Sequence, residues 1–210
     1  IASGAIRDTK NPRDILLAQQ AAKVIINSGY FKDGFSIQTG SGGASLAAVK
    51  FIRESMIEKG IKASYALGGI TAHMVKMHEE GLIKRLIDVQ SFDKVAAESV
   101  KNNEFHKEVS ASEYAAADEQ GSATHYLDIV ILSALEVDVD FNVNVLVGSD
   151  GIIRGAIGGH PDTAADSALS IIVCPLLRGR IPCVVDKVTT LITPGATVDV
   201  VVTEYGIAVN

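Results

Sequence analysis

The sequence has no long apolar run, no excess of positive charge and only two cysteines, and each shortage excludes a class of protein. No apolar stretch approaches the roughly 18 residues that a membrane-spanning helix needs, so no membrane contact is expected. The formal net charge is -6, whereas sequence-independent binding to nucleic acid requires a basic face. Cys174 and Cys183 lie in apolar surroundings, which is typical of reduced, buried thiols in a cytoplasmic protein.

The usual motifs of metal and nucleophile chemistry are also missing. No Ser-x-x-Lys or Gly-x-Ser-x-Gly pattern supplies a serine nucleophile. His73 and His78 lie five residues apart on a predicted helix and so point in different directions, and His106 and His125 fall in a polar section where histidines are usually solvated. We therefore expect no metal site.

Apolar and polar residues alternate along 136–145, which predicts a half-buried strand, and "GSDG" then predicts a hairpin turn. Within this segment "DVDFN" has the spacing of the first ligands of a calcium loop. Such a loop needs glycine at its sixth place and a carboxylate at its twelfth, but these places hold Val143 and Ser149. The strand is therefore the preferred interpretation.

Strand and helix patterns alternate in the first half of the chain, and strand patterns dominate the second. Residues 35–39 predict a strand, a glycine loop follows, and apolar side chains then recur at helical spacing until Gly60, a typical helix stop. The order strand–helix–strand returns between residues 62 and 92. Further strands are predicted at 126–135, 170–177, 182–192 and 197–209. This order favours a layered α/β domain with a mixed sheet.

Glycines gather at three predicted strand ends, at 40–43, 68–69 and 158–159. Ligands of α/β sheets bind outside the carboxyl ends of the strands, so the three clusters indicate a common site. The "TGSGG" loop precedes a helix, whose N-terminus and bare amides would favour an anion. The loop fits neither nucleotide fingerprint, and a tight turn is the alternative.

A tight turn does not explain every residue of the stretch "AIGGHPDTAAD". A turn explains Gly158 and Gly159, but it does not explain His160 and Asp162, which are either site residues or the start of a helix. Two carboxylates near strand ends are either catalytic acids or solvated side chains: Glu136 and Glu204.

Several segments together resemble the citrate lyase α-subunit family, in the same order and over essentially all 210 residues. They are "TGSGGASLAAVKFI", "YALGGITAHMVKM", "DIVILSALEVDVDFNVNVL" and the stretch from "GGHPDT" to "TEYGIAVN". "GG..D" followed by "VTEYGIA" is more distantly similar to acetyl-CoA hydrolases and CoA transferases. The resemblance implies a three-layer α/β/α CoA-transferase-like fold with a mixed, mostly parallel sheet. It also implies that residues 1–210 are a single domain, the C-terminal half of a two-domain subunit.

The chain departs from one branch of that wider family. CoA transferases that form a glutamyl thioester carry Ser-Glu-Asn-Gly near "YALGGIT", but here Leu67 stands at the place of the nucleophilic glutamate. The resemblance therefore implies citrate CoA-transferase activity, within the citrate lyase complex, without a covalent enzyme intermediate. Citrate would attack an acetyl thioester to give a mixed anhydride, and the freed thiolate would then form citryl thioester and release acetate.

Site roles follow from these substrates as hypotheses. The catalytic loop is expected at Gly158, Gly159, His160 and Asp162. The CoA-like thioester arm is expected at Thr39, Gly40, Ser41, Gly42, Gly43, Gly68, Gly69 and Glu204. Because citrate carries three carboxylates, candidate citrate contacts are Arg154, Arg178 and Arg180.

The resemblance implies no tightly bound cofactor in this chain. The prosthetic group, phosphoribosyl-dephospho-CoA, would sit on a carrier protein, and the partners would be citrate, acetyl-CoA or the acetyl carrier protein, the β and γ subunits, and further copies of the chain. Two alternatives stay open: an acetyl-CoA hydrolase or glutamate-dependent CoA transferase, and a non-catalytic assembly domain.

Overall fold

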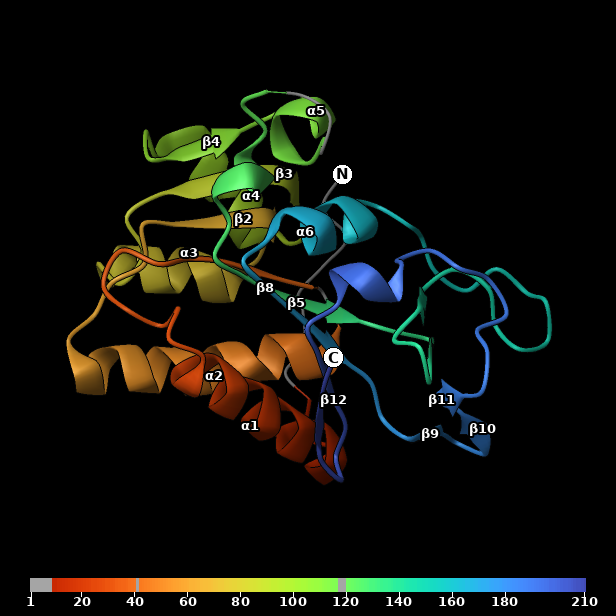
Figure 1. Cartoon of the computed structure of the whole chain (residues 1–210). Helices are drawn as coiled ribbons and strands as arrows, with labels where there is room; N and C mark the ends of the chain where they lie inside the picture. The colour runs from red at the N-terminus through yellow and green to blue at the C-terminus, as the bar shows by residue number, and fades with distance from the viewer. Residues whose placement is uncertain (1–8, 41, 117–119) are drawn as a thin grey trace.

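The computed structural model describes residues 9–40, 42–116 and 120–210 (Figure 1). Its centre is an eight-stranded sheet with the order β13-β12-β8-β5-β1-β2-β3-β4. Every neighbouring pair in this sheet is parallel except β12 and β13, which form an antiparallel hairpin at one edge. The predicted mixed, mostly parallel sheet is confirmed. The strands are β1 (Ser36–Thr39), β2 (Tyr65–Ile70), β3 (Leu86–Ser91), β4 (His106–Glu108), β5 (Ile129–Ser133), β8 (Leu169–Val173), β12 (Val200–Val202) and β13 (Ile207–Val209).

Two separate apolar clusters cover the two faces of the sheet. In β5, Ile129 and Ile131 join one cluster, whereas Val130 and Leu132 join the other, because successive side chains of a strand point to opposite faces. Figure 1 shows α1, α2 and α3 on one side of the sheet and α6 on the other. The first layer consists of α1 (Pro12–Asn27), α2 (Gly43–Lys59), α3 (Ala72–Glu79) and α4 (Lys94–Asn102); the second contains α5 (Ala111–Tyr114), η1 (Ala123–Tyr126), α6 (His160–Asp166) and η2 (Gly195–Thr197). The predicted three-layer α/β/α fold is confirmed.

The predicted helix after the "TGSGG" loop is confirmed as α2. Leu46, Val49, Ile52 and Met56 are all buried on its inner side. The helix ends at Gly60, whose φ of 66° lies in the left-handed region that glycine adopts without a steric penalty. Local sequence therefore determines which side of this helix is buried and where the helix ends.

The segment predicted as one strand over 136–145 is instead a hairpin. Strands β6 (Glu136–Asp138) and β7 (Val143–Asn144) pair antiparallel, and β11 (Val184–Val185) extends this small sheet. The turn forms because Asp138 Oδ1 accepts hydrogen bonds from the amides of Asp140 (3.0 Å) and Asn142 (2.9 Å). Aspartate commonly bonds to nearby backbone in this way, at the expense of a continuous ladder.

Three further expectations are wrong in detail. Of residues 182–192, only Pro182 and β11 belong to strands; Pro182 ends β10 (Ile181–Pro182), which pairs with β9 (Leu177–Arg178). Residues 197–209 contain the β12–β13 hairpin rather than one strand. His106 is buried rather than solvated, because Asp88 and Ser99 hold its ring at 3.2 Å and 2.9 Å. The expected burial of both cysteines is confirmed. No helix within the described ranges is long and apolar enough to cross a membrane.

Candidate functional site

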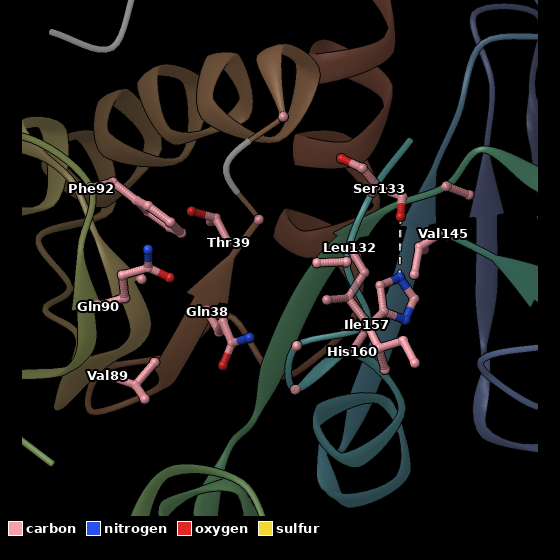
Figure 2. Close-up of a pocket in the computed structure, with 18 of the residues that line it drawn as sticks. Gln38, Thr39, Val89, Gln90, Phe92, Leu132, Ser133, Val145, Ile157 and His160 are labelled. Atoms are coloured by element: carbon pink, nitrogen blue, oxygen red, sulfur yellow. Dashed lines mark hydrogen bonds between the residues drawn. The ribbon is translucent and has the colours of Figure 1, made fainter. Parts of the chain in front are cut away.

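A pocket of about 640 Å³ opens at the carboxyl ends of the central strands (Figure 2). The loop after β1 contributes Gly40 and Gly42, β2 contributes Gly69, and the turn before α6 contributes Gly158 and Gly159. The structure thus brings together all three glycine clusters of the sequence. Parallel strands cause this convergence, because their carboxyl ends share one edge of the sheet.

The pocket holds some of the predicted site residues and leaves others outside. Those that line it are Thr39, Gly40, Gly42, Gly69, Gly158, Gly159, His160 and Arg178. Described residues that do not line it are Gly43, Gly68, Asp162, Arg154, Arg180 and Glu204. Ser41 lies outside the described residues. Glu204 has a local partner instead, since its Oε2 accepts a hydrogen bond of 2.9 Å from the amide of Leu176.

His160 is held by two hydrogen bonds at the rim of α6. Its Nε2 lies 3.1 Å from the Ser133 carbonyl oxygen, and its Nδ1 lies 2.6 Å from Thr193 Oγ1 (Figure 2 shows the first contact). A carbonyl can only accept, so Nε2 carries the proton and Nδ1 accepts from the threonine hydroxyl. The tautomer is therefore fixed by Ser133 and Thr193, and Asp162, which was expected in the same catalytic loop, does not bond to the ring.

Burial decides the charge of His160. Burial lowers the pKa of the imidazole from 6.5 to about 4, although the Ser133 carbonyl opposes this effect. The side chain is neutral at physiological pH and presents a polarised N–H rather than a positive charge. It also does not cap a helix: Gly159 is the N-cap of α6, and no side chain bonds there.

Ser133, at the end of β5, connects the two predicted loops. Its carbonyl accepts from His160, and its Oγ lies 3.1 Å from Ser45 Oγ, in the first turn of α2. A Cβ on Gly42 would come within 2.5 Å of Ser133 Oγ, so a larger residue would displace this hydroxyl from its contact with Ser45. Sequence reasoning missed Ser133; the polar residue that ends the apolar run "DIVILS" was its only signal.

Two more lining residues were missed, Gln38 on β1 and Tyr114 on α5. Their side chains are 5% and 8% exposed, and Gln38 Nε2 donates to the Tyr114 hydroxyl over 2.7 Å. Burial is the main reason that the pKa of Tyr114 is raised to about 12, so this phenol keeps its proton. No local pattern in the polar segment before residue 120 marks Tyr114 as a site residue.

The cationic character of the pocket is slight. Of the described lining residues, Arg178 alone is a lysine or arginine, and its Nη2 donates to the Ala134 carbonyl over 3.0 Å. Arg154 pairs with Asp150 and lines a smaller neighbouring cavity of about 170 Å³, which Arg178 also reaches. Arg180 is exposed. Within the described ranges no group of histidine, cysteine, aspartate and glutamate could hold a metal ion.

Comparison with known proteins assigns the family. The family described as "Citrate lyase, alpha subunit" matches residues 1–210. The chain belongs to this family. It is 60% identical over 210 residues to citrate lyase alpha chains of Klebsiella pneumoniae and of Escherichia coli K12. The match covers 100% of this chain but 41% of each relative, so the chain spans about two-fifths of their length.

Solved structures agree with the family. A crystal structure described as the alpha subunit of citrate lyase from Streptococcus mutans, in complex with citrate, superposes with a TM-score of 0.96 at 58% identity, over 99% of this chain and 41% of that one. A Pseudomonas malonate decarboxylase (TM-score 0.70, 15% identity, 97% of this chain and 44% of that one) shares the fold alone. So does an acyl-CoA transferase of Escherichia coli O157:H7 (TM-score 0.58, 18% identity, 97% and 37%). The CoA-transferase-like fold class is thereby confirmed.

Proposed function

We propose that the protein is the citrate-activating transferase subunit of citrate lyase and that the pocket beside His160 and Ser133 is its site. The subunit would exchange the acetyl group of a carrier thioester for a citryl group. Family membership and the citrate bound by the Streptococcus mutans relative support the substrate. The observation that carries the site is the meeting of three glycine loops with a buried, neutral histidine at one sheet edge.

The reaction needs alignment and oxyanion stabilisation. A citrate carboxylate adds to the acetyl carbonyl, the thiolate leaves, and a mixed anhydride results; the thiolate then adds to the citryl carbonyl and acetate leaves. Each addition places negative charge on a carbonyl oxygen, and donors aimed at that oxygen lower the barrier. The amides of Gly158 and Gly159 are the donors that we assign to this task. His160, whose Nε2–H is held by the Ser133 carbonyl, positions the loop that carries them.

The substrate roles of the remaining residues follow from their positions. The loop with Thr39, Gly40 and Gly42 lies at the N-terminus of α2, which suits an anionic or polar part of the thioester arm. Thr39 Oγ1 is buried and has no hydrogen-bond partner among the described residues, so it is available to a ligand. Arg178 is the cation that we assign to a citrate carboxylate.

Asp162, Gly68, Gly43, Glu204, Arg154 and Arg180 do not line the pocket, and we assign them no direct contact with substrate in this part of the protein. The expected places of Asp162 in the catalytic loop and of Gly68 beside the thioester arm become roles in shaping the pocket. Arg154 and Arg180 stay candidates only for a surface that the rest of the subunit completes.

The wider assignment also belongs to the proposal. We take the chain as one CoA-transferase-like domain of a longer, cytoplasmic subunit. This subunit would work with a lyase subunit, a carrier protein and further copies of itself. The thiol would be the CoA-like prosthetic group of that carrier, and this chain would hold no cofactor of its own.

Glutamate-dependent transfer is the second candidate, and the structure gives it little support. Leu67, at the place of the nucleophile, is fully buried in the apolar cluster behind the pocket. The described lining residues include no aspartate or glutamate. A covalent acyl-enzyme would therefore need a carboxylate from elsewhere in the subunit.

Trapping distinguishes the two candidates in the full-length protein. With acetyl-CoA or acetyl carrier protein but no citrate, hydroxylamine should yield no glutamyl hydroxamate, and acetate should not exchange into the thioester. Initial rates should fit a sequential mechanism in which both substrates are bound together. A modified glutamate, or parallel double-reciprocal lines, would establish the covalent route.

A further inference from the structure

The Gln38–Tyr114 pair is a buried polar unit in the wall of the pocket. Gln38 comes from the end of β1 and Tyr114 from α5, 76 residues later, and both side chains are more than nine-tenths buried. The apolar side chains of Val89, Leu132 and Ile157 line the same pocket (Figure 2). Burying two polar side chains among such neighbours is unfavourable unless their hydrogen-bonding groups are matched.

Two glycines make room for this pair. A Cβ on Gly68 would lie 2.9 Å from Gln38 Cδ, and the φ of Gly68, +99°, is itself unsuited to other residues. A Cβ on Gly159 would lie 2.6 Å from Tyr114 Cε1. Two of the glycine clusters that the sequence marks therefore serve the Gln38–Tyr114 pair, and any larger residue at 68 or 159 would displace it.

The pair leaves hydrogen-bonding capacity unused. Gln38 Oε1 is buried without a partner, and the Tyr114 hydroxyl, which accepts from Gln38, has no acceptor for its own proton among the described residues. Exchanging the oxygen and nitrogen of the Gln38 amide does not remove the problem, because the amide N–H groups then lack a partner. Buried polar groups that line a pocket and lack a hydrogen-bond partner in the protein indicate that a ligand atom supplies the missing hydrogen bond.

The hydrogen-bonding capacity of the Gln38 amide and the Tyr114 hydroxyl indicates which kind of ligand group would bind them. Together they offer one acceptor and one donor that lie close to each other. With the amide nitrogen toward Tyr114, a carboxylate could accept from Tyr114 but would leave the Gln38 oxygen unpaired, and an ammonium would leave the phenol unpaired. A hydroxyl both donates and accepts through one oxygen, so it satisfies both.

We infer that Gln38 and Tyr114 form the subsite that recognises the hydroxyl group of citrate and so distinguish citrate from tricarboxylates that lack it. This inference rests on the proposed function, because it assumes that citrate occupies the pocket. The pair binds substrate and sets specificity; it takes no part in the acyl transfer. Sites that hydrogen-bond a substrate hydroxyl reject the deoxy analogue strongly, since the groups of the site are then left unpaired.

The test compares citrate with propane-1,2,3-tricarboxylate, which is citrate without its hydroxyl, as acceptors from acetyl-CoA in the full-length protein. The wild-type kcat/KM should favour citrate by roughly 100-fold, and Tyr114→Phe and Gln38→Leu should bring this ratio to within about threefold of unity. Tyr65→Phe is the matched control, because the Tyr65 hydroxyl bonds to the Ala123 carbonyl (3.1 Å) and does not line the pocket; it should keep the full ratio.

Each other outcome overturns the inference. An unchanged ratio in Tyr114→Phe, or equal losses for both acceptors, would show that the pair is only structural. A raised KM for the acetyl thioester with an unchanged acceptor ratio would assign the pair to a hydroxyl of the thioester arm. If the wild type transfers to citrate, any of these results refutes the subsite and leaves the proposed function standing. No transfer to citrate by the wild type would refute both.

Discussion

The lowered pKa of His160 predicts how much folding stability the protein loses at acidic pH. This pKa is about 4 in the folded protein and has its ordinary value of 6.5 when the chain unfolds, because burial disfavours the charged ring. The unfolded state therefore binds more protons between these two values, and stability falls as the pH drops through this window. The full difference corresponds to about 3 kcal/mol, and about 2 kcal/mol of it is lost by about pH 5.

Urea unfolding of the wild type and of His160→Gln at several pH values tests this reasoning. Glutamine can donate to the Ser133 carbonyl but does not titrate, so the variant should lack this part of the acid destabilisation. At neutral pH it should be less stable than the wild type by about 1–3 kcal/mol, because Thr193 Oγ1, which is fully buried, loses its acceptor. The difference in the free energy of unfolding between the wild type and His160→Gln should then become smaller as the pH is lowered.

His78→Gln provides the control, since its ring contacts a backbone carbonyl oxygen, that of Ile83 at 2.7 Å, and lies in a partly exposed position. It should keep the acid destabilisation of the wild type. A gap between wild type and His160→Gln that stays constant from neutral pH to about pH 4.5 would refute the argument, because it would mean that His160 titrates alike in both states.

Three other predictions follow from the packing. Gly159→Ala should lower transfer at least about tenfold and destabilise the protein by about 1–3 kcal/mol, since its Cβ would meet Tyr114; normal kinetics and an unchanged urea midpoint would refute this. Leu67→Ala should cost about 2–5 kcal/mol of stability, because the side chain is fully buried, yet keep a sequential mechanism; a complete loss of transfer in a folded variant would indicate a direct role. Burial raises the pKa of the Cys174 thiol to about 12, so iodoacetamide at about pH 8 should label it in the unfolded protein and not in the native one, as mass spectrometry would show.

The sequence predicts the sheet edge well because local signals specify it. Strand, glycine loop and helix follow one another around Gly40, and Gly60 ends the helix, so neither feature depends on distant contacts. The rule that ligands bind at the carboxyl ends of parallel strands then places the site. The resemblance to a known family adds the chemistry, which no single motif carries.

The sequence does not reveal those site residues whose roles depend on contacts between distant parts of the chain. Gln38 gains a role only because Tyr114, far along the chain, packs against Gly159, and Ser133 only because His160 returns to the end of β5. The hairpin after β5 fails for a different reason. The alternation of valine and aspartate is real, but Asp138 is buried and bonds to the backbone of the turn, so its polarity does not indicate exposure.

The most direct test of the site is a crystal structure of the full-length protein with citrate and CoA. Citrate should lie in the pocket between Ser133 and Gly159, with a carboxylate on Arg178 and its hydroxyl on the Gln38–Tyr114 pair, and the CoA thiol should reach the same pocket past Gly42. Citrate bound away from this pocket, or a thiol that ends at another sheet edge, would contradict the account.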